Sequence, residues 1–237
     1  KHGVHMHIPI PQDLFALLTN RLLYRLGFGL VGVFVPIFLY ELFNGSLYAL
    51  MSVYIVYYIA CVLAVPAGSL LLGVFNIRQL LLASVPFAVL SMGSLYYAET
   101  YPVLAVSAFF ITALLYRTLY WVSYQTALAH FIEGKSVGRY VAWYSNALYV
   151  MNALTPLAGG ILITRFGFGF VFLFSAIVLL TTMIPTYFVK IINEKYAWGF
   201  IETFKKLFAY KNRSLLYAYM ADGAQAVVSG VIWPIFI

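Results

Sequence analysis

Charged residues are scarce in this chain of 237 amino acids, at 9% of the total, whereas a typical soluble domain carries about 25%. Hydrophobic residues make up 64%, and the mean hydropathy is +0.93. A water-soluble fold of this length could not bury so much apolar surface. The composition therefore excludes a soluble domain and predicts an integral membrane protein, with the lipid bilayer as its first partner.

Cysteine and histidine are also rare in this chain, with one and four residues. Cys61 is the only cysteine, so no disulfide framework can form within this chain. Three of the four histidines, His2, His5 and His7, stand near the start without an acidic or cysteine neighbour, and we interpret them as accidental features of a terminal segment. We therefore predict no metal site and no cofactor.

Recognisable catalytic patterns are lacking as well. The sequence contains no HExxH motif, no pair of aspartates inside an apolar run, and no nucleophile with an obvious base. These absences argue against a membrane-embedded enzyme, so we predict that the protein is not an enzyme.

The apolar runs are continuous and about 20 residues long, which is the length that a helix needs to cross a bilayer. A membrane barrel would instead show short alternating segments, so helices are favoured. We expect an amphipathic surface helix from Pro11, followed by membrane spans. The expected spans cover about 22–40, 47–74, 80–98, 102–129, 140–163, 168–191, and a stretch from about 214.

The charges between these spans are distributed unevenly. If the loops alternate sides, one side receives Arg21, Arg25, Arg78, Lys135, Arg139, Lys190, Lys195, Lys205, Lys206, Lys211 and Arg213. The other side receives Glu41, Glu99 and a single basic residue, Arg165. Because cytoplasmic loops concentrate Lys and Arg, the pattern predicts a cytoplasmic N-terminus in the cell (inner) membrane. The net charge of +7 then reflects topology and requires no nucleic acid partner.

The basic stretch before the last span has an amphipathic pattern. Apolar residues recur at helical spacing from Phe200 to Phe208, while Glu202, Lys205 and Lys206 fall on the other side. Lysines that meet anionic head groups suit a helix lying at the cytoplasmic membrane surface. The alternative is a docking helix for a partner protein.

A seven-residue pattern, Gly-Val-x-x-Pro-Ile-Phe, occurs at 32–38 and again at 230–236. Each copy follows a Leu-Leu-Tyr triplet, and each lies on a span that enters from the same side. The spacing indicates a parallel internal repeat of about 200 residues, as in transporters built from two related halves.

This repeat leads to a prediction of the architecture. We expect an all-α membrane protein with a six-transmembrane-helix bundle plus the first helix of a second bundle. The predicted parts are a cytoplasmic segment at 1–20, the bundle at 21–191, an amphipathic linker at 192–213, and the first helix of the second bundle at 214–237. We interpret the chain as a fragment, whose missing second half would be a further partner.

Three short runs carry a resemblance to the major facilitator superfamily. They are EGKSVGR at 133–139, PLAGG at 156–160 and FG at 166–167, and together they resemble that family's first half. The resemblance covers about residues 14–237 and implies a helical membrane transporter of small molecules.

Two motifs depart from the family pattern. The antiporter signature of helix 5 reads Gly-Pro-x-x-Gly-Gly, but this chain has Thr155 in the first position, which weakens an assignment to antiport. The signature between helices 2 and 3 has glycines, an Asp and several basic residues. Gly68, Gly73 and Arg78 match it, but residues 70–77 contain no Asp, so the charged gating contact is in doubt.

Arg117 is the most informative polar residue within a span. It lies about 22 Å from Pro102 and about 20 Å from His130 at helical rise, and a charge at such depth should face a cavity or a partner. Tyr120, Tyr124 and Gln125 are expected on its face. The resemblance associates a helix 4 arginine with proton-coupled transport. The alternative is an arginine that bridges helices through backbone carbonyls.

Asp222 is the second candidate, about 12 Å into the last span, with Gln225 on the same face. It would suit the uptake and release of a proton, or it would line a vestibule or pair with a neighbour. Asn152 suits hydrogen bonding to a polar substrate, or to another helix. The 20 Tyr and 20 Phe suggest a site for aromatic or hydrophobic substrates, although lipid-facing packing explains such residues as well.

The function predicted from these features is secondary active transport of a small solute by alternating access. The predicted partners are the lipid bilayer, a small-molecule substrate and protons. The alternatives are a seven-helix membrane receptor or another polytopic membrane protein without transport activity. A receptor is disfavoured because the charge pattern places the N-terminus inside.

Overall fold

The computed structural model describes residues 12–131, 137–193 and 199–236, and this part of the chain is helical without strands. The early histidines, residues 133–136 of the EGKSVGR run, and Lys195 lie outside it. The prediction that the early histidines bind no metal therefore stays a prediction.

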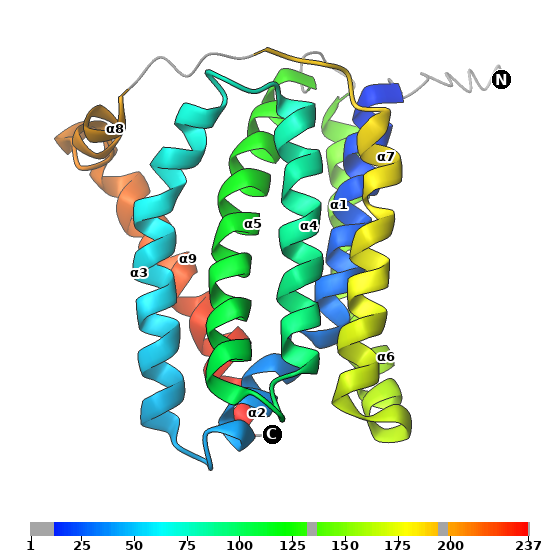
Figure 1. The fold of residues 1–237 in the computed structure, drawn as a ribbon. Helices are drawn as coiled ribbons and strands as arrows, with labels where there is room; N and C mark the ends of the chain where they lie inside the picture. The colour runs from blue at the N-terminus through cyan, green and yellow to red at the C-terminus, as the bar shows by residue number, and fades with distance from the viewer. Residues whose placement is uncertain (1–11, 132–136, 194–198, 237) are drawn as a thin grey trace, which may run out of the picture.

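The helices form an upright bundle with the last segment leaning across one side (Figure 1). They are α1 (Gln12–Val31), α2 (Phe34–Leu42), α3 (Leu47–Leu71), α4 (Ile77–Tyr96), α5 (Pro102–Phe131), α6 (Val137–Thr181), α7 (Met183–Tyr187), α8 (Phe200–Leu207), η1 (Tyr210–Asn212), α9 (Arg213–Val227), η2 (Val228–Ile232) and η3 (Trp233–Phe236).

Six helical stretches of the described chain are long and apolar enough to cross a membrane. One of them, Tyr144–Tyr187, has 44 residues, which would measure about 66 Å as a straight helix, roughly twice the hydrocarbon core of a bilayer. The helix is broken at Gly167, whose φ of 81° lies in the left-handed region that favours glycine. This stretch is therefore two spans joined at Gly167.

Contacts with α1 show that the chain reverses at this glycine. In the arm after Gly167, Ser175 donates to the carbonyl of Gly27 at 2.6 Å, whereas the carbonyl of Thr182 accepts from Asn20 at 3.2 Å. This arm thus runs antiparallel to α1. With the two arms counted separately, the described residues contain seven passes.

The first helix differs from the sequence prediction. A separate surface helix was expected before a span starting near residue 22, but α1 runs without interruption from Gln12. Leu14, Leu17 and Leu18 are buried, so this first part packs against the bundle and does not lie on the membrane surface. As a result, Arg21 and Arg25 lie in the third and fourth turns of a membrane-spanning helix and are not flanking charges.

Both copies of the repeated pattern interrupt their helices. In the first, α1 ends at Val31 and α2 begins at Phe34; in the second, α9 gives way to the π-helical η2 and the 3-10 helix η3. Each copy has its proline four residues after its glycine, and a proline clashes with the carbonyl four residues earlier and offers no N–H to it. The same local cause therefore bends both helices.

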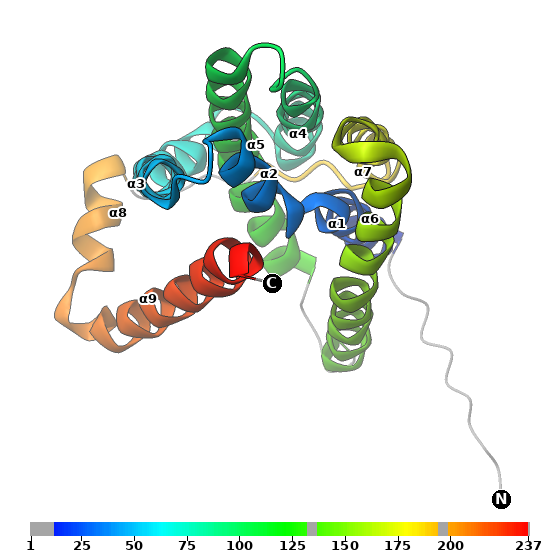
Figure 2. The same ribbon diagram turned by 90° about the horizontal axis from the view of Figure 1, so that it is seen from below.

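The two interrupted segments also pack on each other. Both η2 and η3 contact α2, and Figure 2 shows them meeting near the centre of the bundle. Pro36 in α2 and Pro234 in η3 are both buried. The helical segments that contain the two copies of the sequence pattern therefore contact each other in the structure.

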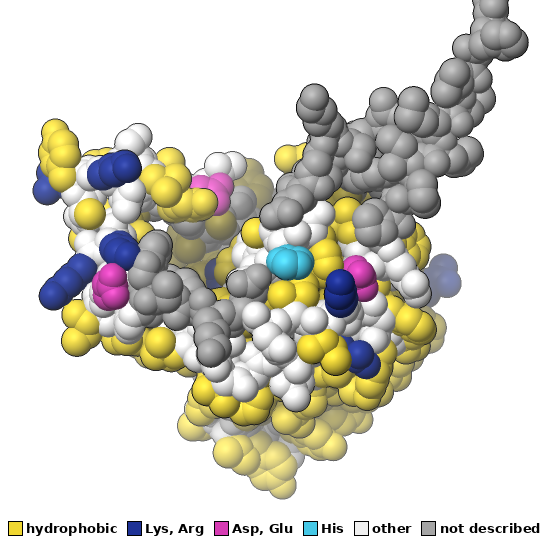
Figure 3. All heavy atoms as spheres, turned by 90° about the horizontal axis from the view of Figure 1, so that it is seen from above, with side chains coloured by type: hydrophobic (Ala, Val, Ile, Leu, Met, Phe, Trp, Pro, Cys, Tyr) yellow, Lys and Arg dark blue, Asp and Glu magenta, His cyan; other side chains and the backbone are white. Residues whose placement is uncertain are grey.

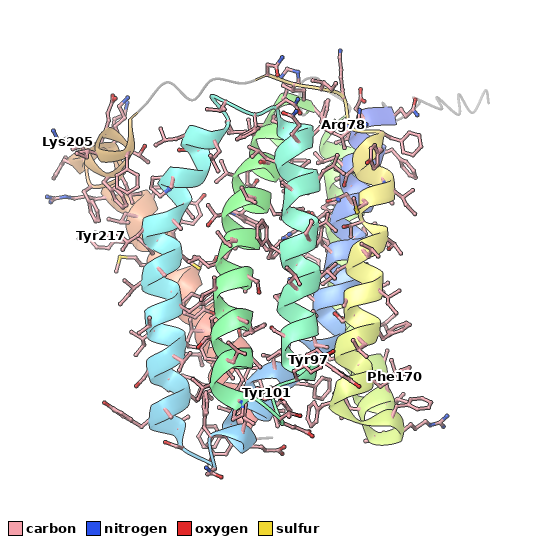
Figure 4. All side chains as sticks on the ribbon, viewed as in Figure 1. Arg78, Tyr97, Tyr101, Phe170, Lys205 and Tyr217 are labelled. Carbon is pink, nitrogen blue, oxygen red and sulfur yellow. The ribbon has the colours of Figure 1, made fainter. Side chains whose placement is uncertain are left out.

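The two ends of the bundle differ in chemistry. Arg78 and Lys205 stand at one end, and Tyr97 and Tyr101 at the other (Figure 4). Figure 3 shows the end that bears Arg78, with Lys and Arg side chains gathered over α8 and a hollow between α8 and the other helix ends. α8 lies at this end and exposes Ile201 at 68%. A position of this helix on the cytoplasmic membrane surface stays a prediction.

Candidate functional site

A cavity of 710 Å³ lies between α1, α3, α5 and α9. Figure 2 shows how these four helices are arranged relative to one another. The charged residues that line it are Arg21 and Arg25 from α1, Arg117 from α5, and Asp222 from α9. The lining is otherwise rich in aromatic rings, which α1, α3 and α5 supply.

Arg21 is held against three aromatic rings of α5. Its guanidinium carbon lies 4.9 Å from the ring centre of Trp121, 5.2 Å from Tyr124 and 5.7 Å from Tyr120. A guanidinium packs well on such faces because the ring quadrupole attracts the cation. The rings orient Arg21 but carry no negative charge that would neutralise it.

Asn20 connects the helices beneath this arginine. It is fully buried and donates to the carbonyl of Thr182 at 3.2 Å and to the hydroxyl of Thr186 at 2.7 Å. Its own carbonyl oxygen accepts from the hydroxyl of Tyr120 at 3.0 Å. The amide therefore ties α1 to α5 and to the α6–α7 region, next to Arg21.

A stack of aromatic rings sets the spacing between α1 and α5. The ring of Tyr116 stacks on Tyr24 at 5.4 Å and on Phe28 at 4.9 Å. The hydroxyl of Tyr24 also bonds with that of Ser84, at 3.0 Å, which adds α4. These contacts hold the arginine-bearing side of α1 at the cavity.

Arg25 has a different kind of partner. Its Nε donates a hydrogen bond to the Oδ1 of Asn152, on the arm of α6 before Gly167. Since the Nε is used, the two terminal amino groups of the guanidinium remain for other acceptors. Asn152 thus orients Arg25 without cancelling its charge.

Arg117 faces the cavity from the opposite side. Its guanidinium carbon lies 6.0 Å from the ring centre of Tyr58, and Tyr54 and Tyr57 line the same wall from α3. Asp222 completes the lining from α9. The arrangement can therefore contact a bound solute with guanidinium groups, one carboxylate and several phenol hydroxyls.

Three of the residues singled out in the sequence meet around this cavity. Arg117 and Asp222 both line it, although they are far apart in the chain. Asn152 does not line the cavity. It accepts a hydrogen bond from Arg25, and Arg25 does line the cavity. Their roles in transport stay predictions.

The other four selected residues lie elsewhere. Tyr120 and Tyr124 are buried, with exposures of 1% and 4%, because Arg21 and α1 cover them. Gln125 and Gln225 are exposed and do not line the cavity. In this structure the two tyrosines contact Arg21 and do not line the cavity. A role of the four side chains in a substrate or proton pathway stays a prediction.

Sequence reasoning missed Arg21 and Arg25, because the first span was placed too late in the chain. It also missed the wall formed by Tyr54, Tyr57 and Tyr58 of α3. Their spacing of three and four residues, which puts them on one side of a helix, was the available signal.

Comparison with known proteins gives one match. A family model described as Major Facilitator Superfamily matches residues 17–236, a range that includes every residue lining the cavity. No curated protein and no solved structure matches the chain.

Proposed function

The chain belongs to the major facilitator superfamily, and on this basis we propose that it is a secondary active transporter that moves a small solute by alternating access. The match confirms the resemblance seen in the sequence, and the chain is a multi-pass integral membrane protein. Members of this family are transporters and not enzymes.

The observation that carries the proposal is a charged cavity lined by helices that are long and apolar enough to cross a membrane. Arg21 and Arg25 lie about 14 and 20 Å along α1 from Gln12. An arginine within the hydrocarbon region costs at least about 2.5 to 3.5 kcal/mol on insertion scales, so such residues mark solute and ion pathways. A 710 Å³ cavity lined by these groups is suited to a small solute.

The contact between the two copies of the repeat supports alternating access. α2 packs against η2 and η3 at the end of the bundle (Figure 1) opposite to Arg78 and Lys205 (Figure 4). Helix contact at this end and a hollow beside α8 at the other end, which Figure 3 shows, correspond to an inward-facing state if the basic end is cytoplasmic. Separation of α2 from η3 would then open the other side.

Uptake by the protein in proteoliposomes tests the proposal. Sugars, amino acids, organic anions and lipophilic cations would be supplied with and without a proton gradient. We expect saturable exchange of one solute class above the level of empty liposomes. Absence of exchange for every class, with protein that remains folded, would contradict transport.

Cysteine labelling tests the access pathway. In a Cys61→Ser background, Ala226→Cys on the cavity lining should react with an impermeant thiol reagent from the cytoplasmic side. Val103→Cys, which is 81% exposed at the other end of the bundle, is the matched control and should react from outside only. Labelling of Ala226→Cys from outside alone would contradict an inward-facing cavity.

A further inference from the structure

We propose that the cavity selects an organic anion with a flat apolar body, such as an aromatic carboxylate, over neutral and cationic solutes of the same shape. The proposal rests on the proposed transport function, because it names the class of solute that this cavity would carry. It is argued from the charges, the hydrogen bonds and the rings of the lining.

The charge balance of the described lining is the first step. Three guanidinium groups face the cavity, against the single carboxylate of Asp222. None of these arginines forms an ion pair within the described part of the chain. A charge withdrawn from water without a partner is costly, and a bound anion would supply that partner.

Arg25 supplies the recognition geometry. Asn152 takes up its Nε, so its two terminal amino groups are left for a ligand. Guanidinium groups bind carboxylates through paired, charge-assisted hydrogen bonds, which are stronger than those between neutral groups. Asn152 is thus a positioning residue, and Arg25 is the residue that would contact the anion.

Arg21 strengthens the preference. It stands one helical turn before Arg25 on α1, and like charges at this spacing repel each other. The rings of Tyr120, Trp121 and Tyr124 keep Arg21 in place without neutralising it. An anion bound near both guanidiniums would relieve the repulsion, whereas a cation would add to it.

The aromatic side chains that line the cavity are the reason to expect a solute with a flat apolar body. Phe28 and Trp121 line the cavity beside the arginines, and Tyr54 and Tyr57 line it from α3. Aromatic side chains favour offset or edge contacts with other rings, and these contacts add to the energy of apolar burial. A volume of 710 Å³ leaves room for a bicyclic ring system together with its charged group.

The experiment compares matched probes on the purified protein in detergent at fixed ionic strength. The probes are 2-naphthoate, its neutral amide 2-naphthamide, the cation 2-naphthylmethylammonium, and the ring-free anion acetate. Equilibrium binding and thermal shift would be measured for each. We expect 2-naphthoate to bind about tenfold or more tightly than the amide and the cation, because these two lose the charge-assisted hydrogen bonds of the carboxylate. Acetate keeps its carboxylate but loses the burial of the rings, so we expect it to bind about tenfold or more weakly as well.

Variants assign this preference to the cavity. Arg25→Gln should weaken binding of 2-naphthoate about tenfold, and Asn152→Asp should also weaken it, because the new carboxylate would pair with Arg25. Asp222→Asn should tighten it, since a repulsive charge is removed. Arg78→Gln is the control, because Arg78 packs on Tyr187 away from the cavity, and it should leave binding unchanged.

The outcomes separate this proposal from transport itself. If 2-naphthoate binds with the expected variant pattern but does not enter proteoliposomes, the anion site stands and the transport function fails. If the amide or the cation binds at least as tightly, or if Asp222→Asn weakens binding of the anion, the anion proposal is overturned whether or not the protein transports another solute. Binding that Arg25→Gln leaves unchanged also overturns it.

Discussion

The guanidinium carbon of Arg21 lies 4.9 Å from the ring centre of Trp121, which joins a charge on α1 to an aromatic face on α5. Together with Tyr120 and Tyr124, this ring gives the cation a defined position inside the bundle. The charge is therefore presented to the cavity by neutral groups. Its position and its lack of a counter-charge lead to the first prediction.

Arg21→Lys should reduce both stability and function, although the charge is conserved. The guanidinium is planar and can stack on aromatic rings, whereas the tetrahedral ammonium of lysine cannot. A cation–π contact contributes about 0.5 to 2 kcal/mol. We expect a lower melting temperature in detergent and slower uptake of the transported solute. Arg165→Lys, at an exposed position for which the described residues show no ring contact, is the control. Wild-type behaviour of Arg21→Lys would show that the rings do not position the charge.

Arg117→Gln should abolish gradient-driven uptake and leave passive exchange measurable. Glutamine conserves much of the side chain's length and hydrogen bonding but removes the charge proposed to participate in proton coupling. Uptake and counterflow would be compared in the same proteoliposomes, with and without a proton gradient. Unchanged dependence on the gradient would contradict the coupling role and favour a purely structural arginine.

Asn20→Ala should destabilise the bundle strongly. The buried amide makes three hydrogen bonds, and its removal leaves the hydroxyl of Tyr120 and the Thr182 carbonyl without this partner. Each buried group left unsatisfied costs about 1 to 3 kcal/mol. Thermal unfolding monitored by size-exclusion chromatography would report the loss. Gln125→Ala, which alters an exposed amide on α5, should unfold like the wild type.

Gly159→Ala should separate α1 from α6. A Cβ at position 159 would collide with the backbone oxygen of Leu30, which cannot rotate away as a side chain can. Overpacking of this kind typically costs about 1 to 3 kcal/mol. Gly93→Ala is the matched control, because a Cβ there meets nothing within 4 Å. Equal thermal stability of the two variants would show that the close approach at Gly159 is not required.

The sequence allowed the helical fold to be predicted because its causes are local. Apolar runs of sufficient length mark the spans, and Asn76 begins α4 with a capping box that can be read from Asn76 and Gln79. Gly167 likewise falls in the predicted break between two spans. The predicted start of the first span was wrong. The first turns of α1 mix polar and apolar residues as a surface helix does, but their leucines pack against the bundle.

The candidate site could be predicted only in part. Arg117 and Asp222 stood out because a charge within an apolar run is rare. The pairing of Arg25 with Asn152 joins residues 127 positions apart, so no local pattern contains it. The cavity-facing tyrosines of α3 have the same spacing as lipid-facing ones, and only the packing of the other helices tells the two apart.

The contact between the two copies of Gly-Val-x-x-Pro-Ile-Phe resembles a homodimer interface, because both sides carry the same sequence pattern, but both sides belong to one chain. In a symmetric homodimer, one mutation changes both sides of the interface at once. Two copies within one chain can differ from each other, as Phe34 and Val35 in the first copy and Ile232 and Trp233 in the second illustrate. The two sides of the contact can therefore become unequal, so that the chain itself can bias which state it prefers without any change in the solute cavity.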